Sequence, residues 1–113
     1  MYDWWAGTII YDWRNIYRSM KILAIEKEIT EIDWNDATNI LKQEVKQVYQ
    51  LYLADQLREI YFTENKNAVL ILETENKDQA QQLLNTLPLV QNKMIEFDVM
   101  ELRPYTGFER IIK

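Results

Sequence analysis

Four runs of strand-forming residues most constrain how this chain can fold. Two segments with the periodicity of a helix and one polar turn separate these runs. The four runs are Lys21–Ile29, Arg58–Thr63, Ala68–Thr74 and Ile95–Leu102. Apolar residues recur at steps of three and four between the first and second runs, and again between the third and fourth, which is typical of helices that face a core. The predicted order of elements is therefore strand, helix, two strands, helix and strand.

Capping residues mark the expected ends of both helices. Asp33 is an N-cap ahead of a helix predicted over residues 34 to about 57. Asn76 caps a second helix predicted over residues 77 to about 87. Pro88 is expected to end that helix, because a proline in a helix interior removes a hydrogen bond and clashes with the preceding turn.

The polar turn at residues 64–67 joins the second and third strands, which we expect to form a hairpin. Together with the order above, this hairpin indicates a ferredoxin-like βαββαβ fold of the α+β class, a four-stranded antiparallel sheet with two helices on one face. The chain has 113 residues, which suits one domain. We expect that domain to span residues 20–113.

Each predicted strand carries apolar side chains on both faces. Val69 and Ile71 lie on one face of the third strand, and Leu70 and Leu72 lie on the other. Because two helices cover only one face, the sequence predicts that a second copy packs on the other, giving a homodimer or a higher homo-oligomer. The tail, residues 105–113, is also rich in apolar residues and is expected to pack on the domain.

Residues 1–19 form an aromatic N-terminal extension that differs from the rest of the chain. Trp4, Trp5 and Trp13 lie within it. Two interpretations stay open. Either Met20 is the natural start of the protein, or the extension packs on the domain or on a partner, since exposed aromatic surface is adhesive.

Composition excludes several classes of function. The chain has no cysteine and no histidine, which excludes disulfides, thiolate chemistry and the histidine-dependent hydrolytic triads. A net charge of −5 is unfavourable for binding nucleic acid. No apolar run approaches the length of a membrane span. We therefore expect a cytoplasmic protein that uses no cofactor or metal and binds neither nucleic acid nor membrane.

Glu44 breaks the pattern of the first predicted helix. On a helical wheel it falls inside the apolar arc, one turn from Ile40 and one turn from Val48. Burial raises the pKa of a carboxyl group, and such a group can take and return a proton near pH 7. The alternative is a buried glutamate that is paired with an arginine or that reaches a water-filled edge.

Few other residues can assist Glu44. Arg58 is expected to share a face of the second strand with Ile60, where it can clamp a substrate carboxylate or pair with Glu44. Tyr61 points the opposite way and offers a hydroxyl group. Glu26 and Glu28 are interpreted as a solvated end of the first strand.

The sequence also resembles a known family. The segment Leu-Leu-Asn-Thr-Leu-Pro-Leu-Val at residues 83–90 and the strand Met-Ile-Glu-Phe-Asp-Val at residues 94–99 are similar to the end of muconolactone isomerases. The resemblance covers roughly residues 20–105. It implies a dimeric α+β barrel that moves a double bond in an unsaturated lactone by proton transfer without a cofactor, with Glu44 as the acid/base. The family carries tryptophan, arginine and histidine residues around the second strand. Of these, this chain keeps only an arginine, Arg58.

Three functional hypotheses follow. The first is a cofactor-free isomerase acting on a small unsaturated lactone or related acid, with Glu44 as acid/base, Arg58 as anion clamp and Tyr61 as hydrogen-bond donor. The second is a non-catalytic dimeric module that binds a small apolar ligand or serves in assembly. The third is a cofactorless monooxygenase, by analogy of fold. A roomy cavity beside an unpaired Glu44 favours the first, and a filled core with Glu44 bound to Arg58 favours the second.

Overall fold

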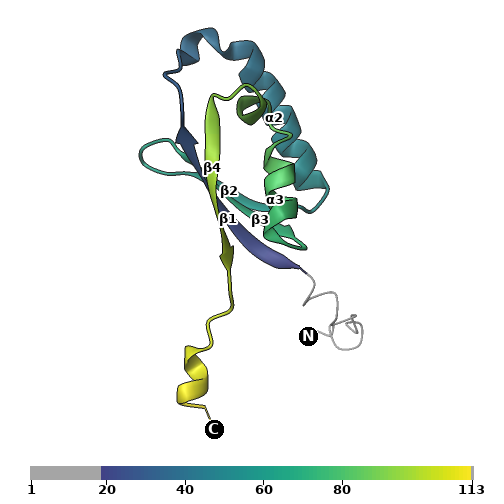
Figure 1. Cartoon of the computed structure of the whole chain (residues 1–113), viewed down its shortest axis with the longest axis vertical. Coiled ribbons are helices and arrows are strands. Elements are labelled where there is room, and N and C mark those ends of the chain that lie inside the picture. The colour runs from purple at the N-terminus through teal and green to yellow at the C-terminus, as the bar shows by residue number, and fades with distance from the viewer. Residues whose placement is uncertain (1–18, 113) are drawn as a thin grey trace.

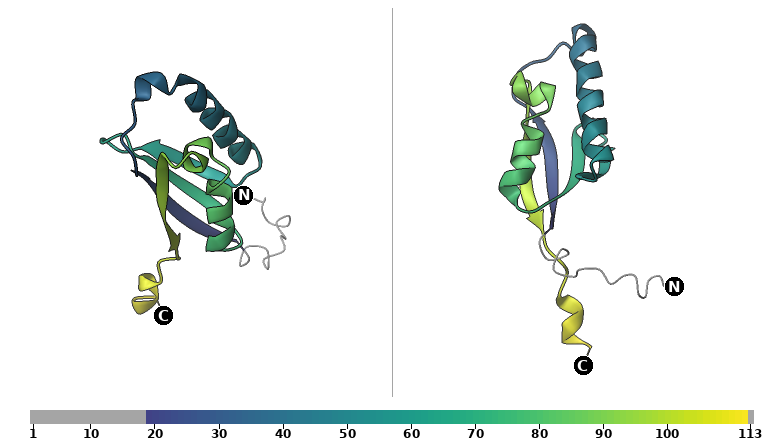
Figure 2. Two further views of the ribbon diagram at one scale, coloured as in Figure 1. Left: turned by 45° about the horizontal axis from the view of Figure 1, so that its top comes forward. Right: turned by 90° about the vertical axis from the view of Figure 1, so that its right-hand side faces the viewer.

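A sheet of four antiparallel strands in the order β2-β3-β1-β4 organises the computed structural model, which describes residues 19–112 (Figure 1). The strands are β1 (Met20–Glu28), β2 (Leu57–Phe62), β3 (Ala68–Thr74) and β4 (Ile95–Leu102). The helices lie on one face of this sheet (Figure 2). The ferredoxin-like α+β fold predicted from the sequence is therefore confirmed. The aromatic extension lies outside the described residues, except for Ser19.

The first predicted helix is divided into two elements. Asp33 caps a 3₁₀ turn, η2 (Trp34–Asp36), by accepting a hydrogen bond of 3.0 Å from the backbone N–H of Asn35. The α-helix α2 (Thr38–Leu53) follows. It ends before the expected position near residue 57, because Asp55 adopts a left-handed conformation (φ 61°) that cannot continue a helix.

The second predicted helix also ends early. Asn76 caps α3 (Lys77–Leu84) as predicted, accepting a hydrogen bond of 2.7 Å from Gln79 N–H. Pro88 does not end this helix but begins a new one, α4 (Pro88–Gln91). A proline suits the first turn of a helix, where its missing N–H has no partner to lose.

The core lies between the sheet and the helices. Alternate side chains of β1 point toward the helices and are buried, beginning with Ile22 and Ala24. β3 does the same with Leu70 and Leu72. The core cluster is completed by residues from α2, α3 and the segments that follow them: Leu51, Leu57, Ala80, Leu84 and Leu87.

The other side of the sheet, here called the open face, carries no helix within residues 19–112. The apolar residues of the open face are Leu23, Ile25, Val69, Ile71, Met100 and Leu102. The first four are half-buried by their neighbours in the sheet, and the last two are exposed. The predicted two-faced character of the strands is thus present in the structure.

The C-terminal tail does not pack on the domain, contrary to expectation. After β4 it runs away from the sheet and forms the 3₁₀ turn η3 (Gly107–Arg110) (Figure 1). Its apolar side chains are exposed: Tyr105, Phe108, Ile111 and Ile112. The pairing of β4 with β1 ends at Leu102, so no sheet hydrogen bond holds the residues that follow against the domain.

We expect Leu72→Ala to lower the free energy of unfolding by about 2–5 kcal/mol, because it leaves a cavity in a fully buried site. Leu53→Ala is the matched control, since Leu53 is exposed on α2, and it should change that free energy by less than about 0.5 kcal/mol. Urea unfolding of both variants measures the difference. Equal effects of the two substitutions would contradict this description of the core.

Candidate functional site

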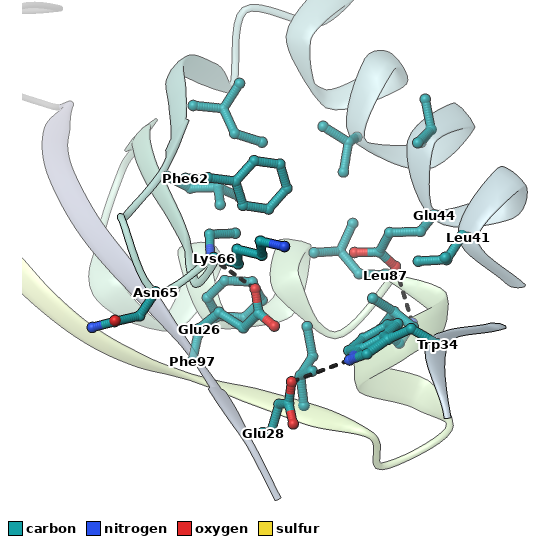
Figure 3. A pocket seen from close by; sticks show the side chains of 17 residues that line it. Glu26, Glu28, Trp34, Leu41, Glu44, Phe62, Asn65, Lys66, Leu87 and Phe97 are labelled. Carbon is teal, nitrogen blue, oxygen red and sulfur yellow. Dashed lines mark hydrogen bonds between the residues drawn. The ribbon is translucent and has the colours of Figure 1, made fainter. Parts of the chain in front are cut away.

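A cavity of about 650 Å³ lies between α2 and the helix-facing side of the sheet (Figure 3). Its volume lies within the range of about 300–1,000 Å³ that is usual for small-molecule sites. Every strand contributes to its lining, together with α2, the residues around α4 and the β2–β3 turn. Most of the lining is apolar and includes the aromatic side chains of Trp34, Phe62 and Phe97. This is the roomy helix–sheet cavity that favours the first hypothesis.

The cavity exists because α2 packs closely on the sheet only near its C-terminal end. Leu51 is the one buried residue of α2. Val45 and Tyr52, which share the helical spacing of the apolar residues of α2, are exposed. On the opposite wall, the small side chain of Ala68 pairs with Phe62 across β2 and β3 and leaves space beneath the helix.

Glu44 projects from α2 into this cavity, as predicted from its place in the apolar arc (Figure 3). Burial raises the pKa of the Glu44 carboxyl group, and the negative charge of Glu26 raises it further. A hydrogen bond of 3.0 Å from Leu89 N–H to Oε1 opposes these two effects on the pKa. No lysine or arginine among residues 19–112 forms an ion pair with Glu44, so the expected alternative of an arginine partner does not occur there.

The hydrogen-bond partner of Glu44 is a backbone N–H group in the first turn of α4. Leu89 is the second residue of α4, where backbone N–H groups have no acceptor within the helix. A second contact in the same region, a hydrogen bond of 3.0 Å from Gln47 to Thr86, also joins α2 to the segment before α4. Glu44 therefore has a structural partner as well as access to the cavity.

Glu26 and Glu28 also line the cavity, and sequence reasoning missed them. Glu26 is not a solvated strand end, because it is only 8% exposed and accepts a hydrogen bond of 2.8 Å from Ala68 N–H. Glu28 accepts one of 3.3 Å from Trp34 Nε1–H. The alternation that buries Ile22 could have placed Glu26 on the same face.

Lys66 is the one basic residue in the lining of the cavity. It lies in the β2–β3 turn with a left-handed backbone (φ 65°), and its side chain reaches toward the cavity (Figure 3). It forms no ion pair with any residue that the structure describes. Sequence reasoning missed it, because the direction of a turn side chain depends on backbone geometry that hydrophobic patterns do not encode.

Arg58 and Tyr61 do not line the cavity. A β-bulge between Leu57 and Glu59 interrupts the alternation of β2, so the expectation that Arg58 shares a face with Ile60 is wrong. Arg58 forms ion pairs of 3.7 Å with Asp55 and 3.5 Å with Glu73.

The Tyr61 hydroxyl donates a hydrogen bond of 2.7 Å to Glu59, outside the cavity. Of the three residues selected from the sequence, the structure thus brings only Glu44 to the cavity.

The three glutamates of the cavity do not make a metal centre. Within residues 19–112 no three acidic, histidine or cysteine side chains lie close enough to hold a metal ion. In the same part of the chain, none of the helices has both the length and the apolar character that crossing a membrane requires.

Comparison with known proteins gives no family. No protein-family model matches the sequence, and no curated protein matches it significantly. The resemblance to muconolactone isomerases therefore stays a prediction.

We expect the raised pKa of Glu44 to make stability depend on pH. Between the ordinary value of 4.5 and the raised value, the folded protein binds more protons than the unfolded chain. The contribution of Glu44 to the free energy of unfolding therefore decreases as pH rises through that window. Glu44→Gln removes this dependence while keeping an acceptor for Leu89 N–H, so the variant should gain stability relative to the wild type as pH rises.

Urea unfolding at a series of pH values between 4 and 8 measures this difference (about the range in which carboxyl groups with raised pKa values titrate). Glu64→Gln, in the exposed β2–β3 turn, controls for the change in net charge. A stability difference between Glu44→Gln and the wild type that stays constant with pH contradicts the prediction.

Proposed function

We propose that the protein is a cofactor-free isomerase, similar to muconolactone isomerases, that moves a proton between two carbons of a small unsaturated lactone or related acid. The observation that supports it best is the position of Glu44, a carboxyl group with a raised pKa that faces a largely apolar cavity of ligand size. A group of this kind accepts a proton more readily than an exposed carboxylate does, and it can return the proton within the same cavity.

In the proposed reaction the ionised Glu44 removes a proton from a carbon next to the carbonyl group or conjugated with it. The electron pair of that C–H bond moves into the conjugated system and gives an enolate. Glu44 then returns the proton to the other end of this system, and the double bond is shifted with no net gain or loss of atoms or electrons. Leu89 N–H, which binds Glu44 Oε1 at 3.0 Å, holds the carboxyl group in position during both transfers.

Lys66 is the group that we assign to the developing negative charge on the carbonyl oxygen. It takes the role that the sequence had suggested for Arg58, since it is a cation with access to the cavity. A positive charge near an enolate oxygen stabilises the transition state more than the neutral ground state. The lining also holds three glutamates, so a neutral lactone ring fits it better than a substrate with several negative charges.

A second candidate is a non-catalytic module that binds a small apolar ligand in the same cavity. It is supported by the bond from Leu89 N–H, which gives Glu44 a structural role in joining α2 to α4 without any reaction. The two candidates differ in whether a bound ligand exchanges a carbon-bound proton.

Proton NMR in heavy water with a panel of small unsaturated lactones and keto acids tests the reaction. We expect deuterium to enter one carbon of a substrate with the wild type, and Glu44→Gln to slow this exchange by about 10²–10⁴-fold, the usual contribution of an acid/base group. Glu64→Gln should keep the wild-type rate. Ligand binding without exchange supports the second candidate, and full exchange in Glu44→Gln overturns the role of Glu44.

The open face supports a further part of the proposal, a homodimer or higher homo-oligomer in which two sheets pack face to face. An apolar sheet surface left in water is unfavourable, and an identical surface on a second copy is self-complementary. We therefore expect the protein to be at least dimeric at micromolar concentration when measured by light scattering.

Met100→Asp places a charge on the open face opposite Leu23 and should shift the protein toward the monomer. Tyr49→Asp, at an exposed aromatic residue of α2, is the control and should leave the oligomer unchanged. A wild-type monomer, or equal effects of the two substitutions, contradicts pairing through the open face.

A further inference from the structure

The cavity between α2 and the sheet is lined by more acidic than basic side chains. Its charged residues are Glu26, Glu28, Glu44 and Lys66. None of the three glutamates forms an ion pair with a lysine or arginine within residues 19–112. The lining therefore has an excess of two negative charges when all three carboxyl groups are ionised. A neutral lactone leaves this excess uncompensated.

Glu26 is a deeply buried carboxyl group with a single hydrogen-bond donor. It is 8% exposed, and Figure 3 shows its carboxyl group directed into the cavity. Oε1 accepts the hydrogen bond of 2.8 Å from Ala68 N–H, but Oε2 accepts none from any residue that the structure describes. A buried carboxylate is stable only when a cation or several donors compensate its charge. Glu26 is therefore suited to a cationic group that enters from the cavity.

Glu44 lies on the opposite wall of the same space. It projects from α2, whereas Glu26 projects from β1 (Figure 3). The charge of Glu26 acts on the Glu44 carboxyl group across the cavity, because it contributes to the raised pKa of that group. Oε1 of Glu44 accepts one hydrogen bond, from Leu89 N–H, and its other oxygen accepts none within residues 19–112. A cation between the two carboxyl groups would receive two acceptors and relieve their mutual repulsion.

Aromatic side chains complete the surroundings of these carboxyl groups. Trp34, Phe62 and Phe97 line the cavity, and the hydrogen bond of 3.3 Å to Glu28 orients the ring of Trp34. Aromatic faces attract ammonium groups through cation–π interactions, and tryptophan does so most strongly. The same rings offer apolar surface to the body of a ligand. The lining thus combines the two features that recognise an organic ammonium ion.

The dimensions of the site favour an organic cation over a metal ion. Among residues 19–112 no three side chains of the kinds that bind metals are close enough to hold one ion. The cavity of about 650 Å³ is much larger than a bare ion and has a mostly apolar lining. A protonated amine with an apolar body fills such a space and places its charge at one point only.

We infer that the cavity binds a small aromatic amine in its protonated form, with the ammonium group between Glu26 and Glu44 and the apolar body against Trp34 and Phe97. The carboxyl groups lose much of their hydration when the chain folds, so the entering amine adds only its own desolvation cost. This binding activity goes beyond the proposed isomerase and requires no reaction in the cavity.

Isothermal titration calorimetry with three probes of similar shape tests the inference on the wild-type protein near neutral pH. Phenethylamine is positively charged, phenethyl alcohol is neutral and phenylpropionate is negatively charged. We expect phenethylamine to bind at least about tenfold more tightly than phenethyl alcohol, the usual gain from one hydrogen bond to a charged group. Phenylpropionate should bind most weakly, because the glutamates repel it.

Glu26→Gln should weaken the binding of phenethylamine by at least about tenfold, because it removes the charge and keeps an acceptor for Ala68 N–H. Glu64→Gln, in the exposed β2–β3 turn, is the matched control and should keep the wild-type affinity. Urea unfolding checks that Glu26→Gln is folded. If it is not, Glu44→Gln takes its place, since glutamine keeps an acceptor for Leu89 N–H.

The inference is overturned if phenethylamine does not bind, or if phenethyl alcohol binds as tightly as the amine. Equal effects of the cavity variant and Glu64→Gln overturn it as well. Calorimetry with these probes does not measure proton exchange, so the two proposals fail separately. Proton exchange in a lactone without amine binding leaves the isomerase standing alone, and amine binding without exchange leaves this inference standing alone.

Discussion

The uneven packing of α2 on the sheet is the constraint on which the rest of the structure depends. Leu51 anchors the C-terminal part of the helix in the core. Near its middle, α2 is held by polar links instead, through Glu44 to Leu89 of α4 and through Gln47 to Thr86. A helix anchored near its C-terminal end and bridged at its middle leaves space between its N-terminal half and the sheet. That space is the cavity. The pKa of Glu44 is raised because its side chain is partly buried there.

Acidic groups in an apolar cavity need compensation, and here hydrogen-bond donors supply much of it. Glu26, Glu28 and Glu44 each accept one hydrogen bond, from Ala68 N–H, Trp34 Nε1–H and Leu89 N–H respectively. A hydrogen bond to a charged group contributes about 1.5–3 kcal/mol, which offsets only part of the cost of removing a carboxylate from water. This imbalance is the physical reason that the pKa of Glu44 is raised despite its bond to Leu89.

The sequence predicted the fold and one residue of the candidate site. Strand periodicity located β3 and β4 at their observed bounds, and Asn76 marked the start of α3. Glu44 was found because it interrupts an apolar arc. The positions of Arg58 and Lys66 could not be predicted in the same way. A bulge moves the first out of its expected register, and a left-handed turn brings the second to the cavity.

By itself the sequence determined the class of fold, the apolar residues on both faces of the sheet, and the position of Glu44 on the apolar side of a helix. These features depend on residue type and on periods of two and 3.6 residues. Only the tertiary structure decided that Glu26 is buried, that Glu44 meets a backbone N–H instead of an arginine, and that the tail leaves the domain. Those outcomes depend on how far α2 stands from the sheet and where β4 ends in space. Distances between elements that are remote in sequence are set by packing, which no local pattern records.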